Sequence, residues 1–186
     1  RQVLSSVCRY YMYGLQLFED HPELSYLTFV TAIEVLSNAI DVDIEELLDD
    51  QIKDVISKIQ SSIDDSEKII NTITSRLFQV RSKFAYTANE LIDSDFFLSR
   101  DDLGGGFPLK EECFTECVKA CYDLRSLHLH TEVQFIEYLM NVYGGSEVIP
   151  GAPIVEDRDL QKTLSKAPTL IGLERLVRYI TLKFIH

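Results

Sequence analysis

Apolar side chains recur at helical spacing along almost the whole chain, and the residues that interrupt helices are confined to a few short stretches. All five prolines and most of the eight glycines fall between or at the ends of long segments that contain neither. Helices are therefore predicted over the approximate ranges 2–19, 23–40, 43–62, 64–91, 110–142 and 168–184. Irregular loops are predicted near 99–109 and 143–166. No segment shows the alternation of a strand, so the predicted fold class is all-α.

The second predicted helix is apolar on almost every side, which is typical of a helix at the centre of a bundle. Three polar residues, Thr31, Glu34 and Asn38, nevertheless follow one line at i, i+3 and i+7. A buried carboxylate without a partner is costly, so we expect Glu34 to have a cationic or hydrogen-bonding partner. This pattern is compatible both with a structural ion pair and with a supporting role at a functional site.

Length and composition are those of an ordinary soluble globular protein. The chain has 186 residues, of which 46% are hydrophobic and 26% charged, and this predicts a single domain over 1–186. It begins with Arg1 rather than Met, which is compatible with a piece of a longer chain. No apolar run is long enough to cross a bilayer and no signal peptide is evident, so we expect a cytoplasmic protein with no membrane partner.

The net charge of −12 argues against a general nucleic-acid surface, because polyanions are bound by releasing counterions to Lys and Arg. The charge is uneven along the chain. Residues 41–68 hold ten acids and three lysines, whereas residues 158–186 hold six bases and two acids. A local basic region near the C-terminus is therefore compatible with the acidic total.

Three of the four cysteines, Cys113, Cys117 and Cys121, recur every four residues and so lie along one face of a helix. The outer two would be about 12 Å apart along that helix, which is too far to share one metal ion. We expect these side chains to act as small buried apolar groups, and we expect no metal and no cofactor. The spacing does not suggest a disulfide framework, which favours a reducing compartment.

The segment YDLRSLHLHTE, residues 122–132, holds two of the four histidines inside an otherwise apolar stretch. Arg125 lies close to the stripe of apolar side chains that should face the core or a partner subunit. A guanidinium in that position needs a carboxylate or a phosphate to accept its hydrogen bonds, and Glu34 is the internal candidate. The segment is therefore either a polar helix end or a small site that handles phosphate.

A related pattern occurs earlier in the chain. Aligning residues 76–92 with 120–136 pairs Arg81 with Arg125 and sets Tyr86 opposite His130. The two segments share an aromatic residue, an aliphatic residue and an Arg-Ser pair in the same register. We interpret Arg81 and Tyr86 as a degenerate second copy of the element.

These features resemble the HEPN superfamily, in particular the Apea-like HEPN domains. The resemblance rests on the Arg-x4-His element from Arg125 to His130, on the run AIEVL around Glu34, and on the closing segment LIGLERLVRYITLKFI. It implies a HEPN-like helical bundle that forms a homodimer. HEPN proteins that are active cut RNA without a metal, and each active centre usually forms where two protomers meet.

The resemblance therefore implies a metal-independent endoribonuclease of bacterial or archaeal toxin or defence systems. RNA would be its substrate, and an antitoxin or a fused regulatory domain would restrain it. His130 would be the general acid or base and Arg125 the clamp on the phosphate, oriented by Glu34. The remaining supporting residues would be Tyr122, Ser126, His128 and Asn38.

The spacing leaves the arrangement of these groups open. On a straight helix Arg125 and His130 point about 140° apart, whereas His128 lies only about 60° from Arg125. Either the helix ends or distorts between them, or the cleft lies across a dimer seam, or His128 is the working histidine. The rival interpretation is a non-catalytic HEPN-like module that uses the same helices for dimerisation or to bind a nucleotide or a partner domain.

Overall fold

The computed structural model describes residues 2–42, 50–63, 66–77, 80–99, 106–140 and 143–185. Within these ranges the chain forms ten α-helices and two short 3-10 helices, and it contains no strand beyond an isolated bridge between Val148 and Pro168. The all-α class predicted from the sequence is confirmed. In chain order the elements are α1 (Gln2–Leu17), α2 (Pro22–Ala39), α3 (Asp50–Ser62), α4 (Ser66–Leu77), α5 (Arg81–Glu90), α6 (Ser94–Leu98), η2 (Glu111–Cys113), α7 (Phe114–Thr131), α8 (Ile136–Met140), η3 (Tyr143–Gly145), α9 (Arg158–Leu164) and α10 (Leu170–Ile185).

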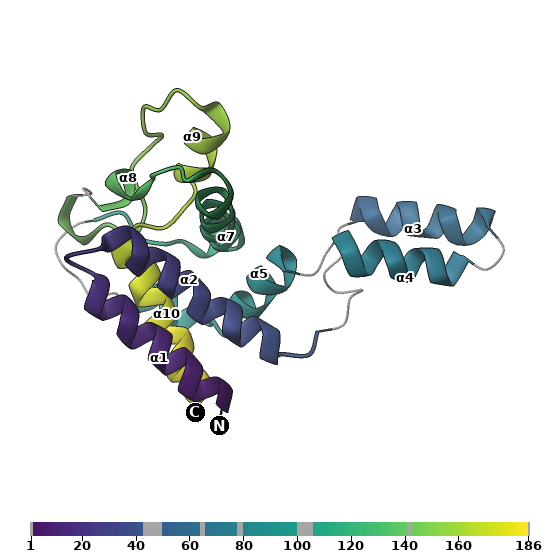
Figure 1. Ribbon diagram of the computed structural model, residues 1–186, viewed down its shortest axis with the longest axis horizontal. Helices are drawn as coiled ribbons and strands as arrows, with labels where there is room; N and C mark the ends of the chain where they lie inside the picture. The colour runs from purple at the N-terminus through teal and green to yellow at the C-terminus, as the bar shows by residue number, and fades with distance from the viewer. Residues whose placement is uncertain are drawn as a thin grey trace.

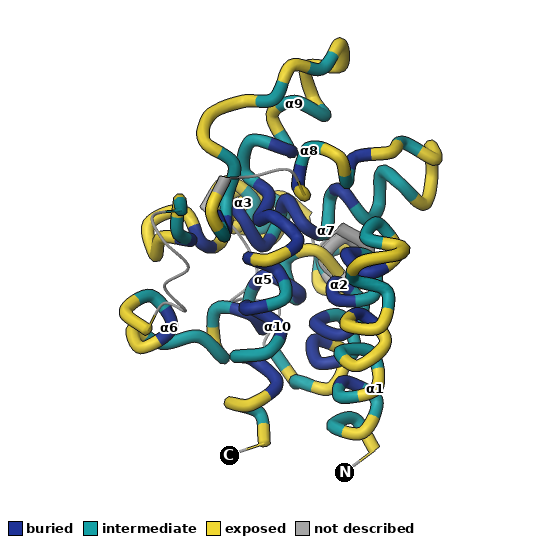
Figure 2. Tube along the Cα trace, turned by 90° about the vertical axis from the view of Figure 1, so that its left-hand side faces the viewer, coloured by how far each residue is buried: buried dark blue, intermediate teal, exposed yellow. Residues whose placement is uncertain are grey.

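The central helix is α2, as its apolar sequence predicts. It packs against α1 and α10 and also against α5 and α7, and Figure 1 shows α1, α2 and α10 side by side. The buried segments, dark blue in Figure 2, run through α2, α5, α7 and α10. Burying one large side chain stabilises the fold by about 1.5–3 kcal/mol. The fully buried side chains of α2 include Tyr26, Phe29, Ile33 and Leu36.

Helices α3 and α4 form a hairpin that projects away from the main body (Figure 1). Among the side chains described between residues 51 and 72, none is buried. The buried core therefore contains no described side chain of residues 51–72. The predicted acidic helix over 43–62 is present as α3 from residue 50, and residues 43–49 lie outside the described residues. The predicted helix over 64–91 is divided into α4 and α5.

The single helix predicted over 110–142 is wrong, because the chain breaks it after Thr131 into α7 and α8. Glu132 adopts a left-handed conformation with φ of 55°. Tertiary contacts outweigh the helical pattern at this point. The Phe135 N–H donates to Glu23 of α2, and the Phe135 ring is buried edge-on against Tyr26.

The irregular loop predicted over 143–166 contains a helix, α9, that the sequence interpretation missed. The carboxylate of Asp157 caps it by accepting hydrogen bonds from the N–H groups of Asp159 and Leu160. Leu164 anchors its last turn in the core. A helix of seven residues is too short to show a clear apolar period, which explains the omission. In the other predicted loop, 106–110 is irregular, and 100–105 lies outside the described residues.

Among the described helices, none has both the length and the apolarity needed to cross a bilayer. Cys117 and Cys121 are buried in the face of α7 that meets the core, as predicted. Cys113 is exposed, because it precedes the first residue of α7 and lies outside the buried stripe.

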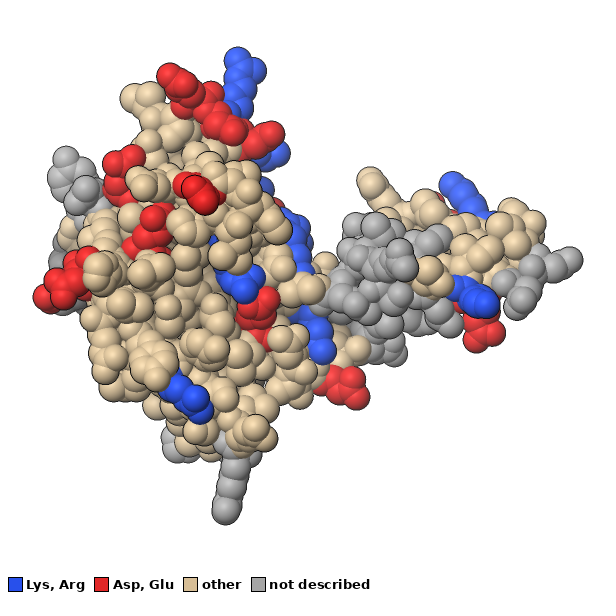
Figure 3. Space-filling model, viewed as in Figure 1, with Lys and Arg blue, Asp and Glu red and all other residues tan. Residues whose placement is uncertain are grey.

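The basic region expected near the C-terminus is largely neutralised in the fold. Four of the six bases in 158–186 pair with carboxylates, which leaves few of them available to a polyanion. Figure 3 shows Lys and Arg side chains scattered among Asp and Glu on the face drawn, rather than gathered in one basic surface. The pairs are Lys166 with Glu116, Arg175 with Glu147, Arg178 with Glu174, and Lys183 with Asp93.

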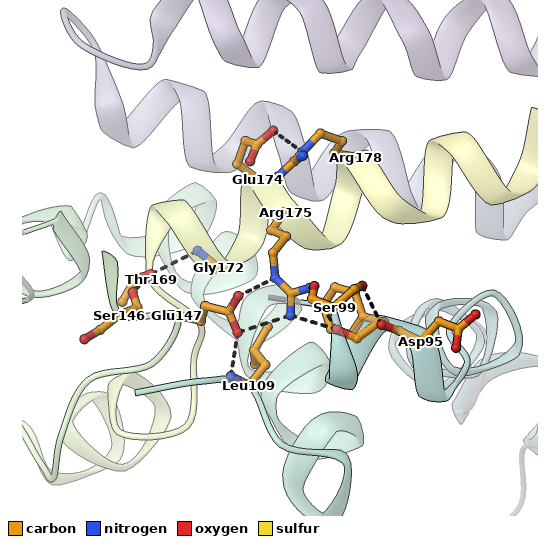
Figure 4. Close-up of polar contacts among 11 residues, drawn as sticks. Asp95, Ser99, Leu109, Ser146, Glu147, Thr169, Gly172, Glu174, Arg175 and Arg178 are labelled. Carbon is orange, nitrogen blue, oxygen red and sulfur yellow. Dashed lines mark hydrogen bonds and ion pairs between the residues drawn. The ribbon is translucent and has the colours of Figure 1, made fainter. Parts of the chain in front are cut away.

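The pair Arg175–Glu147 is the most deeply buried of these, with side chains only 8% and 6% exposed (Figure 4). Arg175 of α10 also donates to the Phe96 carbonyl at 2.9 Å and stacks over the Phe96 ring. Glu147 accepts a further hydrogen bond from the Leu109 N–H at 2.8 Å. This network joins α6 and two irregular segments, at Leu109 and Glu147, to α10. Neither Arg175 nor Glu147 was singled out from the sequence.

Candidate functional site

The ion pair expected between α2 and α7 is present. Nη2 of Arg125, in the middle of α7, lies 2.8 Å from Oε2 of Glu34. The two side chains are 21% and 18% exposed, so the pair is shielded from bulk water but open on one side. A guanidinium carries five N–H donors and a single carboxylate accepts at most two of them in a bidentate pair, so donors remain for a second anion.

The position of Arg125 follows from the pattern of α7. The buried stripe of the helix ends with Leu124, and Arg125 borders it on the side that faces α2. On α2, Glu34 lies on the polar line predicted from the sequence. Thr31 of that line is half-buried and donates to the Leu27 carbonyl of its own helix, and Asn38 is exposed.

A second contact between the same two helices was missed by the sequence interpretation. Nδ1 of His128 lies 3.0 Å from the Val133 carbonyl oxygen and 3.7 Å from Oε1 of Glu23. The same Glu23 oxygen accepts the Phe135 N–H at 3.0 Å. Glu23 and Glu34 are eleven residues apart, about three turns, and so lie on one side of α2. That side therefore provides a carboxylate to Arg125 and another to His128.

His130 is exposed in the last turn of α7, and its side chain has no hydrogen bond or ion pair to another described residue. The helix is continuous from Phe114 to Thr131, so it neither ends nor breaks between Arg125 and His130. Within one chain the two side chains consequently point about 140° apart. The two arrangements that remain are a cleft across a dimer seam and a site that uses His128.

Of the other expected supporting residues, Tyr122 has a packing contact with a neighbouring helix. The Tyr122 ring packs against Phe84 of α5, with ring centroids 5.5 Å apart, and so helps to join α5 to α7. Ser126 is half-buried, one residue beyond Arg125.

The proposed second copy of the element occupies a different place in its helix. Arg81 is the first residue of α5, whereas Arg125 is in the middle of α7. Both Nε and Nη2 of Arg81 donate at 2.6 Å to the Asp123 carboxylate of α7, and Tyr86 is half-buried. Arg81 thus joins α5 to the side of α7 that faces away from Arg125, because Asp123 and Arg125 lie about 200° apart around the helix.

A hollow of about 230 Å³ lies between α5, α7 and α9 on that opposite side. Three acids and three bases line it together with Ala120 and Thr163, so its formal charges cancel and it has no preference for an anion. The charged lining residues are Arg81, Glu116, Asp123, Asp159, Lys162 and Lys166. Within the described residues, no three His, Cys, Asp or Glu side chains are gathered as metal ligands would be.

The chain matches no family model, and no curated protein or solved structure is significantly similar to it.

Proposed function

We propose that this chain is a HEPN-type endoribonuclease that cuts RNA without a metal. The observation that supports the proposal best is the Glu34–Arg125 ion pair, because it orients a guanidinium that is still partly exposed. A pre-oriented guanidinium stabilises charge that develops on a phosphate in the transition state, and this kind of electrostatic stabilisation is often the largest contribution to catalysis.

The reaction would be attack of a ribose 2′-oxygen on the adjacent phosphorus. The 2′-hydroxyl loses its proton to a base, the new P–O bond forms, and the P–O5′ bond breaks as the leaving oxygen gains a proton. The products are a 2′,3′-cyclic phosphate and a 5′-hydroxyl. Histidine is suited to these proton transfers near neutral pH, and Arg125 would bind the non-bridging phosphate oxygens.

The active centre would form between two copies of the chain. His130 is exposed and points about 140° away from Arg125 on the same helix, so one copy does not bring the two onto one phosphate. A two-fold homodimer would bring Arg125 of one copy beside His130 of the other. In this proposal the enzyme acts in the cytoplasm as a toxin or defence nuclease, and an antitoxin or a fused regulatory domain restrains it.

A second candidate is a non-catalytic HEPN-like module for dimerisation or for binding a nucleotide or a partner domain. It is favoured by the net charge of −12 and by the pairing of most C-terminal bases with carboxylates, because an RNA substrate needs free cationic groups along its path.

Incubation of the purified chain with labelled single-stranded RNA in EDTA tests the proposal. We expect cleavage that leaves 2′,3′-cyclic phosphate ends, and we expect Arg125→Ala to lower kcat by about 10²–10³-fold, the usual effect of removing one group that stabilises transition-state charge. The matched control is Arg81→Ala, which removes the ion pair between α5 and α7 and should leave the rate nearly unchanged. Full cleavage by Arg125→Ala, or cleavage that requires a divalent cation, would contradict the proposal. Absence of cleavage by the wild type would favour the non-catalytic module.

A further inference from the structure

We propose that His128, positioned by Glu23 and by the Val133 carbonyl, is a second proton-transfer group of the same active centre. This inference rests on the proposed ribonuclease function. It adds a catalytic residue, His128, and a positioning residue, Glu23. Neither of them is the arginine or the histidine that defines the Arg-x4-His motif.

His128 lies close to Arg125 on the same helix. The two residues are three positions apart on a continuous helix, so they lie about 60° apart around it and about 4.5 Å apart along it. Both face α2, since each has a carboxylate of α2 within 4 Å. A phosphate held by Arg125 would therefore lie within reach of His128 of the same chain.

One ring nitrogen of His128 is held by a backbone acceptor. A carbonyl oxygen only accepts hydrogen bonds, so the 3.0 Å contact with Val133 requires the proton of the neutral ring to be on Nδ1. Nε2 then carries the lone pair and is the nitrogen that exchanges a proton with the substrate. Fixing one nitrogen with a backbone or carboxylate acceptor is how proteins select the tautomer of a working histidine.

The surroundings of His128 hold its side chain in place but leave it partly exposed. Glu23 binds the Phe135 N–H and lies beside Nδ1, so it ties the turn after α7 to α2. The Phe135 ring stands edge-on to the imidazole at 6.0 Å. The side chains of His128 and Glu23 nevertheless remain 23% and 20% exposed.

The reaction involves two proton transfers, so a second histidine can act beside the first. One leaves the 2′-hydroxyl as the 2′-O–P bond forms, and one reaches O5′ as the P–O5′ bond breaks. His130 of one copy and His128 of the other would each carry one of these protons, and no redox partner or co-reactant is needed.

Kinetics of RNA cleavage in EDTA test the assignment. We expect His128→Ala to lower kcat by about 10²-fold or more, as general acid–base groups do, with KM changed by less than about two-fold. Glu23→Gln should lower kcat by about ten-fold, because the amide oxygen still accepts the Phe135 N–H while the carboxylate beside Nδ1 is lost. Glu19→Gln changes an exposed acid in the turn after α1; it is the matched control and should behave as the wild type.

Tautomer assignment by long-range ¹H–¹⁵N NMR of the wild-type chain gives a readout that does not depend on cleavage or on the folding of a variant. We expect His128 to carry its proton on Nδ1, with the exposed His130 as the internal reference for an unconstrained ring. A proton on Nε2 of His128 would overturn the inference. If the wild type is active and His128→Ala keeps its kcat, the inference is also overturned, although the proposed function then stands. Absence of cleavage by the wild type would overturn the proposed function and this inference together.

Discussion

At the scale of single residues, the partly exposed charges of this protein derive their properties from the neighbours that hydrogen-bond to them. Asp93 is an example away from the candidate site. Its carboxylate accepts hydrogen bonds from Lys183 and Tyr179 of α10, and it also caps α6 by accepting the Asp95 N–H. The donors on α10, Lys183 first, lower the pKa of Asp93 from 3.8 to about 2. The negative form of this residue therefore helps to hold α6 against α10.

This gives a pH-dependent contribution to stability whose sign follows from the lowered pKa. Because the folded-state pKa lies below the unfolded one, the contribution is complete above about pH 4 and is lost as the pH falls toward about 2. Thermal melts of wild type and Asp93→Asn should differ by a constant Tm gap near neutral pH, and the gap should shrink over that acid range. Asparagine can still cap α6, so Asp93→Asn removes the charge and keeps the cap. Lys183→Met removes the cation and should make the pH dependence of the Tm weaker. A Tm gap that does not change down to about pH 2 would contradict the assignment.

Some residues of the candidate site could be predicted from the sequence, and others could not. Glu34 and Arg125 were predicted to pair because each breaks an apolar stripe and therefore needs a partner. The sequence did not indicate a role for Glu23, since an acid in the first turn of a helix is common. The contact of His128 with Val133 depends on the left-handed turn at Glu132, and a helical pattern does not predict that turn.

At the scale of elements, three of the four longest described helices were predicted well, whereas the end of the fourth, α7, and the short helices were not. α1, α2 and α10 begin and end within about two residues of their predicted bounds, because each is 16 to 18 residues long and shows its period several times. α6, α8 and α9 have five to seven residues and are determined by capping and by anchoring side chains such as Phe96 and Leu164. The loops between them are positioned by the Arg175–Glu147 network rather than by local sequence.

Removing one partner of that network should release those loops. Glu147→Gln leaves the Arg175 guanidinium without its carboxylate in the interior, and we expect a loss of about 3–5 kcal/mol in the free energy of unfolding. Urea unfolding measures the loss, and hydrogen exchange at the Leu109 N–H reports the release of the loop locally. The double variant Glu147→Leu, Arg175→Met should recover much of the stability, because a hydrophobic pair leaves no buried charge. A loss below about 1 kcal/mol in Glu147→Gln would contradict the structural role.

At the scale of the whole molecule, the fold places α2 at the centre and leaves the end of α7 at the surface. α2 is covered by α1, α10, α5 and α7, so its carboxylates can hold Arg125 and His128 of α7 in fixed positions. The last turn of α7, with His130, is exposed and therefore accessible to a second copy. The proposed nuclease thus combines a rigid half-site within one chain with a histidine supplied by another.

Mixing two inactive variants tests this shared active centre most directly. Arg125→Ala and His130→Ala, each purified alone, should cleave RNA in EDTA at a small fraction of the wild-type rate. After equimolar mixing and subunit exchange, half of the dimers contain one of each chain, and one of their two sites has both residues intact. The expected activity of the mixture is therefore about one quarter of that of the wild type. A mixture that exchanges subunits but remains as inactive as its components would contradict an active centre built from Arg125 of one copy and His130 of the other.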